Sequence, residues 1–416
     1  MVTTRPLVDR SWSFSDLSTK DTNYASHGYH RYPAKFIPQI VNRILQDYSK
    51  PNDVVLDPFG GCGTTSLECL LNSRHSISID INRVAVMISK AKTNHLSNGV
   101  LRRKNEVLLN KLQRQKSRRD CYPSAHQRLK YWFKRSQYNK LMRIYLALES
   151  ESNPKYRLFY KVCFSNILKQ CSIWYSKSIK PMQDPSKLNI NPQESFERHL
   201  SYMTKRNKEF GNLISKSDTG SNKCSVSHGD ARRLTLRNSE VDLIVTSPPY
   251  VTSYEYADIH QLSSLWFKHV HDVVKMKKDF VGTLISSEEH SNIVLPSLKR
   301  TVKKIKKFDG RLSRQVNNYF HDIDGCYSEM NRVLKKNGYL ALIIGNTEYK
   351  GVKIDNLGIS AELLKNHGFK IRKIIKRKLS SKIFTPYRNK AGKFASPQNS
   401  TRRVYQYEYV AIAQKK

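Results

Sequence analysis

Apolar runs that each end in a polar residue alternate with segments of helical periodicity along this chain. Residues 54–57 form a short run that ends in Asp57, and residues 64–71 follow it with helical spacing after a glycine-rich turn. Residues 76–80 repeat the pattern, end in Asp80, and precede a second predicted helix. This order of strand, helix, strand and helix predicts an α/β fold.

Further strands are predicted nearer the C-terminus. Residues 242–246 and 339–344 are typical of buried strands, and a helical segment at residues 318–335 precedes the second of them. Residues 369–378 and 403–413 are expected to pair as an antiparallel hairpin. We therefore expect a mostly parallel sheet that is closed by this C-terminal hairpin.

Two segments do not follow the sheet pattern. Residues 101–223 are rich in lysine, arginine, serine and asparagine but carry apolar residues at helical spacing, which predicts a mainly helical basic insertion. Residues 270–317 form a second basic insert. The sheet-forming parts are then residues 1–100 and 224–416. The clearest helical patterns of the insertion cover residues 128–147 and 157–177.

The chain carries a large excess of positive charge. Lysine and arginine number 73 against 34 aspartate and glutamate residues, which gives a formal net charge of +39. Such an excess predicts a polyanionic partner. Nucleic acid is favoured over an anionic membrane surface, because the sequence has no apolar run of spanning length.

Targeting and cysteine patterns narrow the expectation further. Residues 1–21 lack the apolar core and cleavage site of a secretory signal, so we expect a cytoplasmic protein. The seven cysteines are scattered, without a Cys-x-x-Cys pair. This spacing predicts reduced thiols and no metal site, and the lack of an apolar run of spanning length predicts no membrane association.

The turn after the first predicted strand is a candidate ligand site. Gly60, Gly61 and Gly63 would let backbone N–H groups approach a ligand, because glycine lacks Cβ and tolerates positive φ. Asp80, at the end of the second strand, stands where doubly wound folds bind ribose hydroxyls. The chain has no Gly-Lys-Ser or Gly-Lys-Thr of a P-loop, and Asp57 suits a cationic or amino-bearing ligand. Alternatively, the turn is purely structural and Asp80 caps the next helix.

The segment Thr246-Ser247-Pro248-Pro249-Tyr250 directly follows a predicted strand and is the second candidate site. Its two prolines fix φ and stiffen the loop. Such a loop suits the exocyclic amine of cytosine or adenine. This amine must pyramidalise before its nitrogen can attack a methyl group on sulfur, because its lone pair is delocalised into the ring. We expect the Ser247 Oγ and the Pro248 carbonyl to hold the two amine hydrogens, while Tyr250 stacks on a base extruded from the duplex. The alternative is a simple proline turn after a strand.

Together, residues 57–65 and 246–250 resemble the cofactor and catalytic motifs of bacterial amino-methylating DNA methyltransferases of restriction–modification systems, in their Ser-Pro-Pro-Tyr subgroup. Residues 30–38 are similar to the segment that embraces the methionine end of the cofactor in this family, which implies that role for Lys35 and Phe36. Gly229-Asp230-Ala231 resembles the family's third-strand acidic position, which contacts the adenine amine of the cofactor.

The resemblance implies a Rossmann-like methyltransferase fold with a seven-stranded sheet, S-adenosyl-L-methionine as cofactor, double-stranded DNA as substrate and a cognate restriction endonuclease as a partner. The implied cofactor-binding residues are Lys35, Phe36, Asp57, Phe59, Gly60, Gly61, Gly63, Thr64, Asp80 and Asp230, and the implied catalytic residues are Ser247, Pro248, Pro249 and Tyr250.

One position departs from the family pattern, since Cys62 stands where serine is usual. Cytosine-C5 methyltransferases need a cysteine nucleophile after a proline, and the chain has no Pro-Cys dipeptide. Serine before Pro-Pro-Tyr favours the N4 of cytosine as the target in this family, with the N6 of adenine as the alternative. A DNA-binding subunit without activity and an RNA amino-methyltransferase are further alternatives.

The DNA-reading part is expected outside the sheet. Residues 101–223 are the candidate target-recognition region, and residues 270–317 are a second DNA-facing element, because their basic side chains suit phosphate contacts. The expected catalytic loop, residues 246–250, is followed by Tyr254, Tyr256 and His260. These three residues either border the flipped base or belong to the core.

Overall fold

The computed structural model describes residues 6–416 apart from 34, 115–119, 216–221, 252–254, 284–294, 350, 380–386, 390–395, 397 and 404–405.

Seven strands form one sheet in the order β3-β2-β1-β4-β5-β11-β8. Strands β1 to β5 pair in parallel, and β11 runs antiparallel to both β5 and β8. The carboxyl ends of the parallel strands therefore share one edge of the sheet, where open α/β sheets bind ligands. The strands are β1 Val54–Asp57, β2 His75–Asp80, β3 Cys224–His228, β4 Val241–Thr246, β5 Leu334–Ile344, β8 Phe369–Lys378 and β11 Tyr407–Lys415.

The sheet lies between two helical layers. Successive side chains of its central strands point to opposite faces, so each strand can pack against both layers. In β5, Ala341 and Ile343 pack with α1, and Leu340 and Leu342 pack with α13. The helices of the sheet domain are α1 Pro38–Tyr48, α2 Thr64–Leu71, α3 Arg83–Lys92, α13 Gly310–Val333 and α14 Asn356–Asn366. The expected α/β fold with a mostly parallel seven-stranded sheet is confirmed.

The C-terminal hairpin is also confirmed, since β8 and β11 pair antiparallel from Tyr407↔Lys378 to Lys415↔Phe369. Strand β11 lies between β5 and β8, so it completes the sheet instead of extending its edge. Two small hairpins, β6 Thr347–Tyr349 with β7 Val352–Ile354 and β9 Tyr387–Arg388 with β10 Arg402–Arg403, lie outside the sheet.

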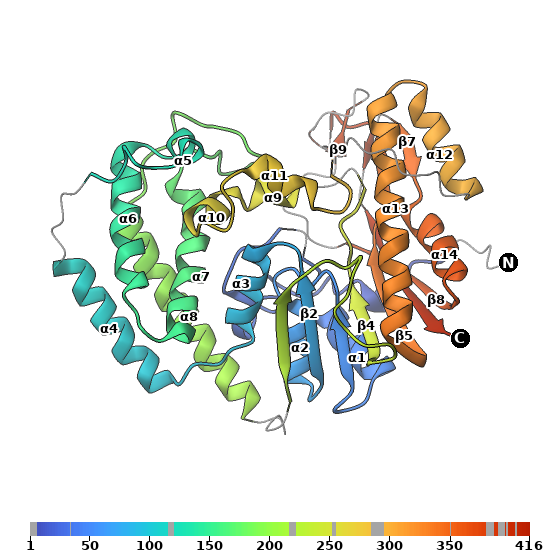
Figure 1. Ribbon diagram of the computed structural model, residues 1–416, viewed down its shortest axis with the longest axis horizontal. Coiled ribbons are helices and arrows are strands. Elements are labelled where there is room, and N and C mark those ends of the chain that lie inside the picture. The colour runs from blue at the N-terminus through green and yellow to red at the C-terminus, as the bar shows by residue number, and fades with distance from the viewer. Residues whose placement is uncertain are drawn as a thin grey trace.

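The segment between β2 and β3 forms a helical body at the β3 end of the sheet, and α12, α13 and α14 lie toward the other end (Figure 1). Its helices are α4 Asn98–Arg114, α5 Gln127–Trp132, α6 Arg135–Glu149, α7 Pro154–Cys171 and α8 Pro192–Ile214. The helical pattern at residues 128–147 is divided between α5 and α6, because Phe133 adopts an extended conformation between them. The helix within the pattern at residues 157–177 ends at Cys171.

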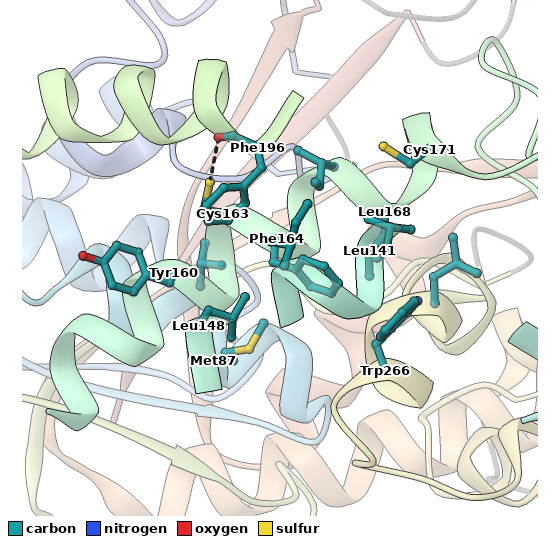
Figure 2. Packing of buried hydrophobic residues seen from close by; sticks show 14 of the residues in the cluster. Met87, Leu141, Leu148, Tyr160, Cys163, Phe164, Leu168, Cys171, Phe196 and Trp266 are labelled. Atoms are coloured by element: carbon teal, nitrogen blue, oxygen red, sulfur yellow. Dashed lines mark hydrogen bonds between the residues drawn. The ribbon is translucent and has the colours of Figure 1, made fainter. Parts of the chain in front are cut away.

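The helical body has no separate core. Met87 of α3 and Trp266 of α10 (Gln261–Trp266) pack among the buried side chains of α6, α7 and α8 (Figure 2). Helix α10 follows the catalytic loop in sequence, after α9 Tyr256–Ile259. The insertion therefore shares one hydrophobic core with α3 and α10. Two further helices, α11 Val273–Lys278 and α12 Pro296–Lys306, lie in the second basic insert, and two short 3₁₀ helices, η1 Arg10–Trp12 and η2 Ala25–Gly28, precede the sheet.

Within the described part of the chain, no helix has the length and apolar character needed to cross a membrane. The same residues contain no group of three or more histidine, cysteine, aspartate or glutamate side chains placed to hold a metal ion.

Candidate active site

A cleft lies at the carboxyl ends of β1, β2 and β4. Ten of the predicted site residues line it, namely Lys35, Phe36, Phe59, Gly60, Gly61, Thr64, Asp80, Asp230, Ser247 and Pro249. Asp57, Gly63, Pro248 and Tyr250 are not part of its wall. The topology thus brings the N-terminal segment, the glycine turn and the catalytic loop together around one space.

Asp57 lies behind the glycine turn, where its side chain is 2% exposed. Its Oδ1 accepts hydrogen bonds from the Thr246 hydroxyl at 2.7 Å and the Phe59 N–H at 3.1 Å, and its Oδ2 accepts one from the Thr65 hydroxyl at 2.7 Å. Burial raises the pKa of Asp57 to about 6, although these bonds oppose the rise. Asp57 therefore joins the ends of β1 and β4 to the start of α2, and it can affect a ligand in the cleft only through the turn.

The glycines of the turn serve different purposes. A Cβ at Gly60 would lie 1.9 Å from the Ser78 Oγ of β2, and a Cβ at Gly63 would lie 2.3 Å from the Ser89 Oγ of α3. Gly63 also has a φ of +76°, which favours glycine. These two glycines are needed for packing, whereas Gly61, with a φ of +50°, presents its backbone to the cleft.

Asp80 lies on the cleft wall and fixes the turn. Its Oδ2 accepts a hydrogen bond from the Gly61 N–H and its Oδ1 accepts one from the Asn82 N–H, both at 2.7 Å. Burial raises the pKa of Asp80 to about 6. The cap of α3 is Asn82, whose side chain accepts from the Val84 N–H at 3.0 Å, so the alternative role of Asp80 as that helix cap is wrong.

The N-terminal segment forms the facing wall of the cleft. Lys35 Nζ donates to the Asn23 Oδ1 at 2.7 Å and to the His27 carbonyl at 3.2 Å, and burial lowers the pKa of Lys35 to about 8. Tyr32 stacks on His260, with 4.9 Å between ring centroids, and both Tyr32 and Phe36 line the cleft. The ammonium group of Lys35 and two aromatic faces are thus held at one end of the space.

Asp230, predicted at the end of the third strand, also lines the cleft but is already paired. Arg232 donates to both of its carboxylate oxygens, with the closest contact at 2.7 Å, and also bonds Asp322 at 2.9 Å. A ligand amine that approached Asp230 would therefore share the carboxylate with Arg232.

The catalytic loop is held by contacts from distant elements. The Tyr319 hydroxyl of α13 donates to the Pro249 carbonyl at 2.7 Å. The Tyr250 hydroxyl donates to the Glu408 Oε1 of β11 at 3.1 Å, and the Glu408 Oε2 accepts from Arg377 of β8 at 2.7 Å. Pro248 is buried. Because Thr246 is bonded to Asp57, the loop is held on both sides of Ser247 and Pro248.

A second, wider cleft adjoins the first. The two share Pro249, Tyr256, Phe280 and Val281, so the catalytic loop lies at their junction. Tyr250 lines the second cleft. The rest of its wall includes Arg128 and Lys180 from the insertion and Arg311, Gln315 and Tyr319 from α13.

Several of these residues could not be found from the sequence. Tyr319 lies within a long helical pattern, and nothing in that pattern marks a contact with the catalytic loop. The sequence does mark Glu408 as unusual, since it is an acidic residue inside an apolar strand pattern. Its partner Arg377 lies 31 positions away in sequence, so their contact could not be predicted. Tyr256 was expected either beside the base or in the core, and it lines both clefts. Tyr254 lies outside the described residues.

The family model of the N6/N4 DNA methylases matches residues 3–91 and 241–416, which hold every strand of the large sheet except β3. The chain belongs to the N6/N4 DNA methylase family. The family model does not cover residues 92–240, which hold α4 to α8 and β3.

Individual relatives of this DNA methylase agree with that assignment. The chain is 25% identical over 395 residues to the type II methyltransferase M.MvaI of Kocuria varians, and the match covers 87% of each protein. It is 38% identical over 85 residues to the type II methyltransferase M.MjaII of Methanocaldococcus jannaschii, which covers 20% of this chain and 16% of that one. Among solved structures, a SAM-dependent methyltransferase of Methanosarcina mazei matches with 12% identity and a TM-score of 0.31, covering 93% of this chain and 98% of that one.

S-adenosylmethionine is the cofactor of the DNA methylase family to which the chain belongs. The residues of the first cleft suit its parts. Asp80 offers a carboxylate for ribose hydroxyls, Lys35 offers a cation, and Phe36 and Phe59 offer apolar faces. The carboxylate, the ammonium group and the apolar faces of this cleft therefore fit the cofactor that the family requires.

Proposed function

We propose that this methylase is a site-specific, type II DNA methyltransferase that transfers a methyl group to the exocyclic N4 of cytosine in a base flipped out of the duplex. The observation that carries the proposal is the position of the catalytic loop. Ser247 faces the first cleft, Tyr250 faces the second, and Pro249 belongs to both. A base that enters through the second cleft would meet the cofactor at Ser247.

The chemistry needs two acceptors on the amine. When bound, S-adenosylmethionine supplies a methyl group on a positively charged sulfur. The Ser247 Oγ and the Pro248 carbonyl would each hold one amine hydrogen, so that the nitrogen lone pair leaves the plane of the ring and points at the methyl group. Transfer would form the nitrogen–methyl bond as the sulfur–carbon bond of the bound cofactor breaks, and the acceptor that holds one amine hydrogen would pass this proton to solvent.

Contacts around the loop support this arrangement. Tyr319 bonds the Pro249 carbonyl, and the Tyr250 hydroxyl is bonded to Glu408, so the loop backbone and the Tyr250 ring are held before substrate arrives. A preorganised loop places its acceptors without a reorganisation cost at the moment of reaction. The Tyr250 ring would then offer one face to the flipped base.

Cytosine N4 is proposed over adenine N6 because serine occupies the first position of the Ser-Pro-Pro-Tyr loop. The names of the relatives support a role in a restriction–modification system, with a cognate endonuclease as partner. Residues 101–223 are proposed as the target-recognition region, since Arg128 and Lys180 bring this insertion to the second cleft.

Replacement of Ser247 tests the catalytic assignment. Ser247→Ala should lower kcat by about 10² to 10³-fold, since one preorganised hydrogen-bonding group is lost, while the Kd for S-adenosylmethionine stays within about twofold of wild type. Ser225→Ala, at an exposed position of β3, is the matched control and should keep wild-type activity. An active Ser247→Ala variant, measured with labelled cofactor and duplex DNA, would overturn the assignment.

A further inference from the structure

Helix α12 presents a face of uncompensated positive charge. Its exposed residues are almost all basic, and the helix packs against α13 through its opposite, apolar side. Among the residues that the structure describes, none of these basic side chains forms an ion pair. The basic set is Lys299, Arg300, Lys303, Lys304, Lys306 and Lys307.

This arrangement is unfavourable for the helix by itself. Lys299 and Lys303, Arg300 and Lys304, and Lys303 and Lys307 are like-charged pairs at i and i+4, which destabilise a helix. Four basic residues of the set stand in the last turn and cap, at positions 303–307, where the helix dipole offsets only part of their mutual repulsion. A polyanion that binds along this face would remove the repulsion.

The position of α12 connects this face to the second cleft. After α12 ends at Lys306, the chain enters the cleft wall at Asp309 and Arg311. Phe308 stacks on Tyr349, with ring centroids 6.5 Å apart, and Tyr349 is itself part of that wall. Figure 1 shows α12 on the outer side of α13, while the insertion reaches the cleft from the other side.

We propose that α12 is the phosphate anchor of this methylase, a surface that binds the backbone of the duplex flanking the target site on one side. The proposal rests on the proposed function, because the duplex must present its target base to the second cleft. Phosphate contacts fix position and orientation but carry no sequence information, so α12 sets affinity and register while the insertion is left to read bases.

The buried side of α12 favours DNA over an anionic membrane. Leu298 and Ile305 are at most 1% exposed and belong to the core beneath the helix. A surface helix that binds a bilayer inserts its apolar face, and this face is already occupied. The exposed face of α12 therefore offers only positive charge to a partner, and this charge suits the regularly spaced phosphates of a duplex.

The test compares two triple variants with the same loss of charge. Lys299→Gln/Lys303→Gln/Lys307→Gln removes one row of α12, and glutamine keeps a similar helix propensity. Lys365→Gln/Lys370→Gln/Lys373→Gln is the control, because these exposed lysines lie around α14 and the first half of β8. Phe369 of β8 pairs with Lys415 of β11, which places the start of β8 at the end of the sheet away from the cleft.

The α12 variant should bind cognate and non-cognate duplexes more weakly by a similar factor, about tenfold or more at moderate salt. The slope of log Kd against log salt should fall in magnitude by about 0.9 for each lost contact. Its kcat at saturating DNA and its Kd for S-adenosylmethionine should stay at wild-type values, and the control variant should match wild type in salt slope.

Trimming the duplex locates the contact. Removing several base pairs from one flank should weaken binding by wild type and have little further effect on the α12 variant, while trimming the other flank should weaken both equally. An unchanged salt slope in the α12 variant, with methylation intact, would overturn the anchor and leave the proposed function standing. Absence of methylation by wild type itself would instead overturn the proposed function. Equal weakening of binding to anionic vesicles and to structured RNA, with duplex binding unchanged, would also overturn the anchor.

Discussion

The Thr246 hydroxyl donates a 2.7 Å hydrogen bond to the buried carboxylate of Asp57, and this bond joins the proposed catalytic loop to the glycine turn. The two residues are 189 positions apart in sequence, at the carboxyl ends of the neighbouring strands β1 and β4. The position of Ser247, the next residue in the chain, therefore depends on the same carboxylate that fixes the glycine turn.

Thr246→Val should uncouple the two motifs. Valine keeps the shape but leaves Asp57 without one donor, which should cost about 1–3 kcal/mol of unfolding free energy, and displacement of Ser247 should lower kcat by about tenfold to a hundredfold. Thr246→Ser keeps the hydroxyl and should retain most of kcat. Chemical denaturation and steady-state methylation measure both effects, and equal kcat values for the valine and serine variants would contradict the coupling.

Asp57→Asn should change how stability depends on pH. Burial raises the pKa of Asp57 to about 6 from an ordinary value of 3.8, so the folded protein keeps a proton that the unfolded chain releases between these values. The stability that this carboxyl contributes is largest below about pH 4 and is lost as pH rises through 6. Wild type should therefore lose roughly 1 kcal/mol relative to Asp57→Asn between pH 5 and pH 7. Urea denaturation of the two proteins across this range measures the difference, and parallel curves would show that Asp57 does not titrate there.

Gly60→Ala should distort the turn, because the new Cβ would lie 1.9 Å from the Ser78 Oγ. Such overpacking should cost about 1–3 kcal/mol of stability and weaken cofactor binding. Ser78→Ala in the same chain removes the closest atom and should restore part of both losses. Gly325→Ala is the control, since a Cβ there meets nothing within 4 Å. Calorimetric titration with S-adenosylmethionine measures the loss of cofactor binding. A double variant that binds the cofactor no better than Gly60→Ala would show that the contact with Ser78 does not cause the loss.

Glu408→Ala should destabilise the protein more than Glu408→Gln. Arg377 is 3% exposed, and loss of its carboxylate partner leaves a buried cation, at a cost of about 3–5 kcal/mol. Glutamine keeps an acceptor for the Tyr250 hydroxyl or for Arg377 and should cost less. Tyr250→Phe removes only the hydroxyl bond, so it should lose about 1 kcal/mol and keep most activity. Thermal and chemical denaturation rank the stability of the three variants. A Glu408→Ala variant as stable as wild type would show that the ion pair of Glu408 and Arg377 does not stabilise the loop.

Local patterns were sufficient to predict much of the fold and of the cofactor cleft. The apolar runs ending in Asp57 and Asp80 predicted parallel strands, and parallel strands bring their carboxyl ends to one edge, so both carboxylates were expected near the glycine turn. Periodicity could not show that Phe133 would interrupt a helix, because a buried aromatic in an extended conformation keeps the same apolar pattern.

Contacts between distant elements were out of reach of the sequence. Asp57 was expected to face a ligand, but its partners Thr65 and Thr246 come from two other elements, and their hydroxyls draw it behind the turn. The Arg232 side chain that occupies Asp230 stands only two positions away, so this pairing was within reach of local reasoning. The insertion shows the same limit, since its helices were predicted but their shared core with α3 and α10 was not.

The target atom is decided most directly by nucleoside analysis of methylated DNA. Duplex DNA is incubated with the protein and labelled S-adenosylmethionine, digested to nucleosides, and the labelled nucleoside is identified by chromatography and mass. We expect N4-methylcytosine from wild type and no label from Ser247→Ala. Label found only in N6-methyladenine or in 5-methylcytosine would contradict the assignment of cytosine N4.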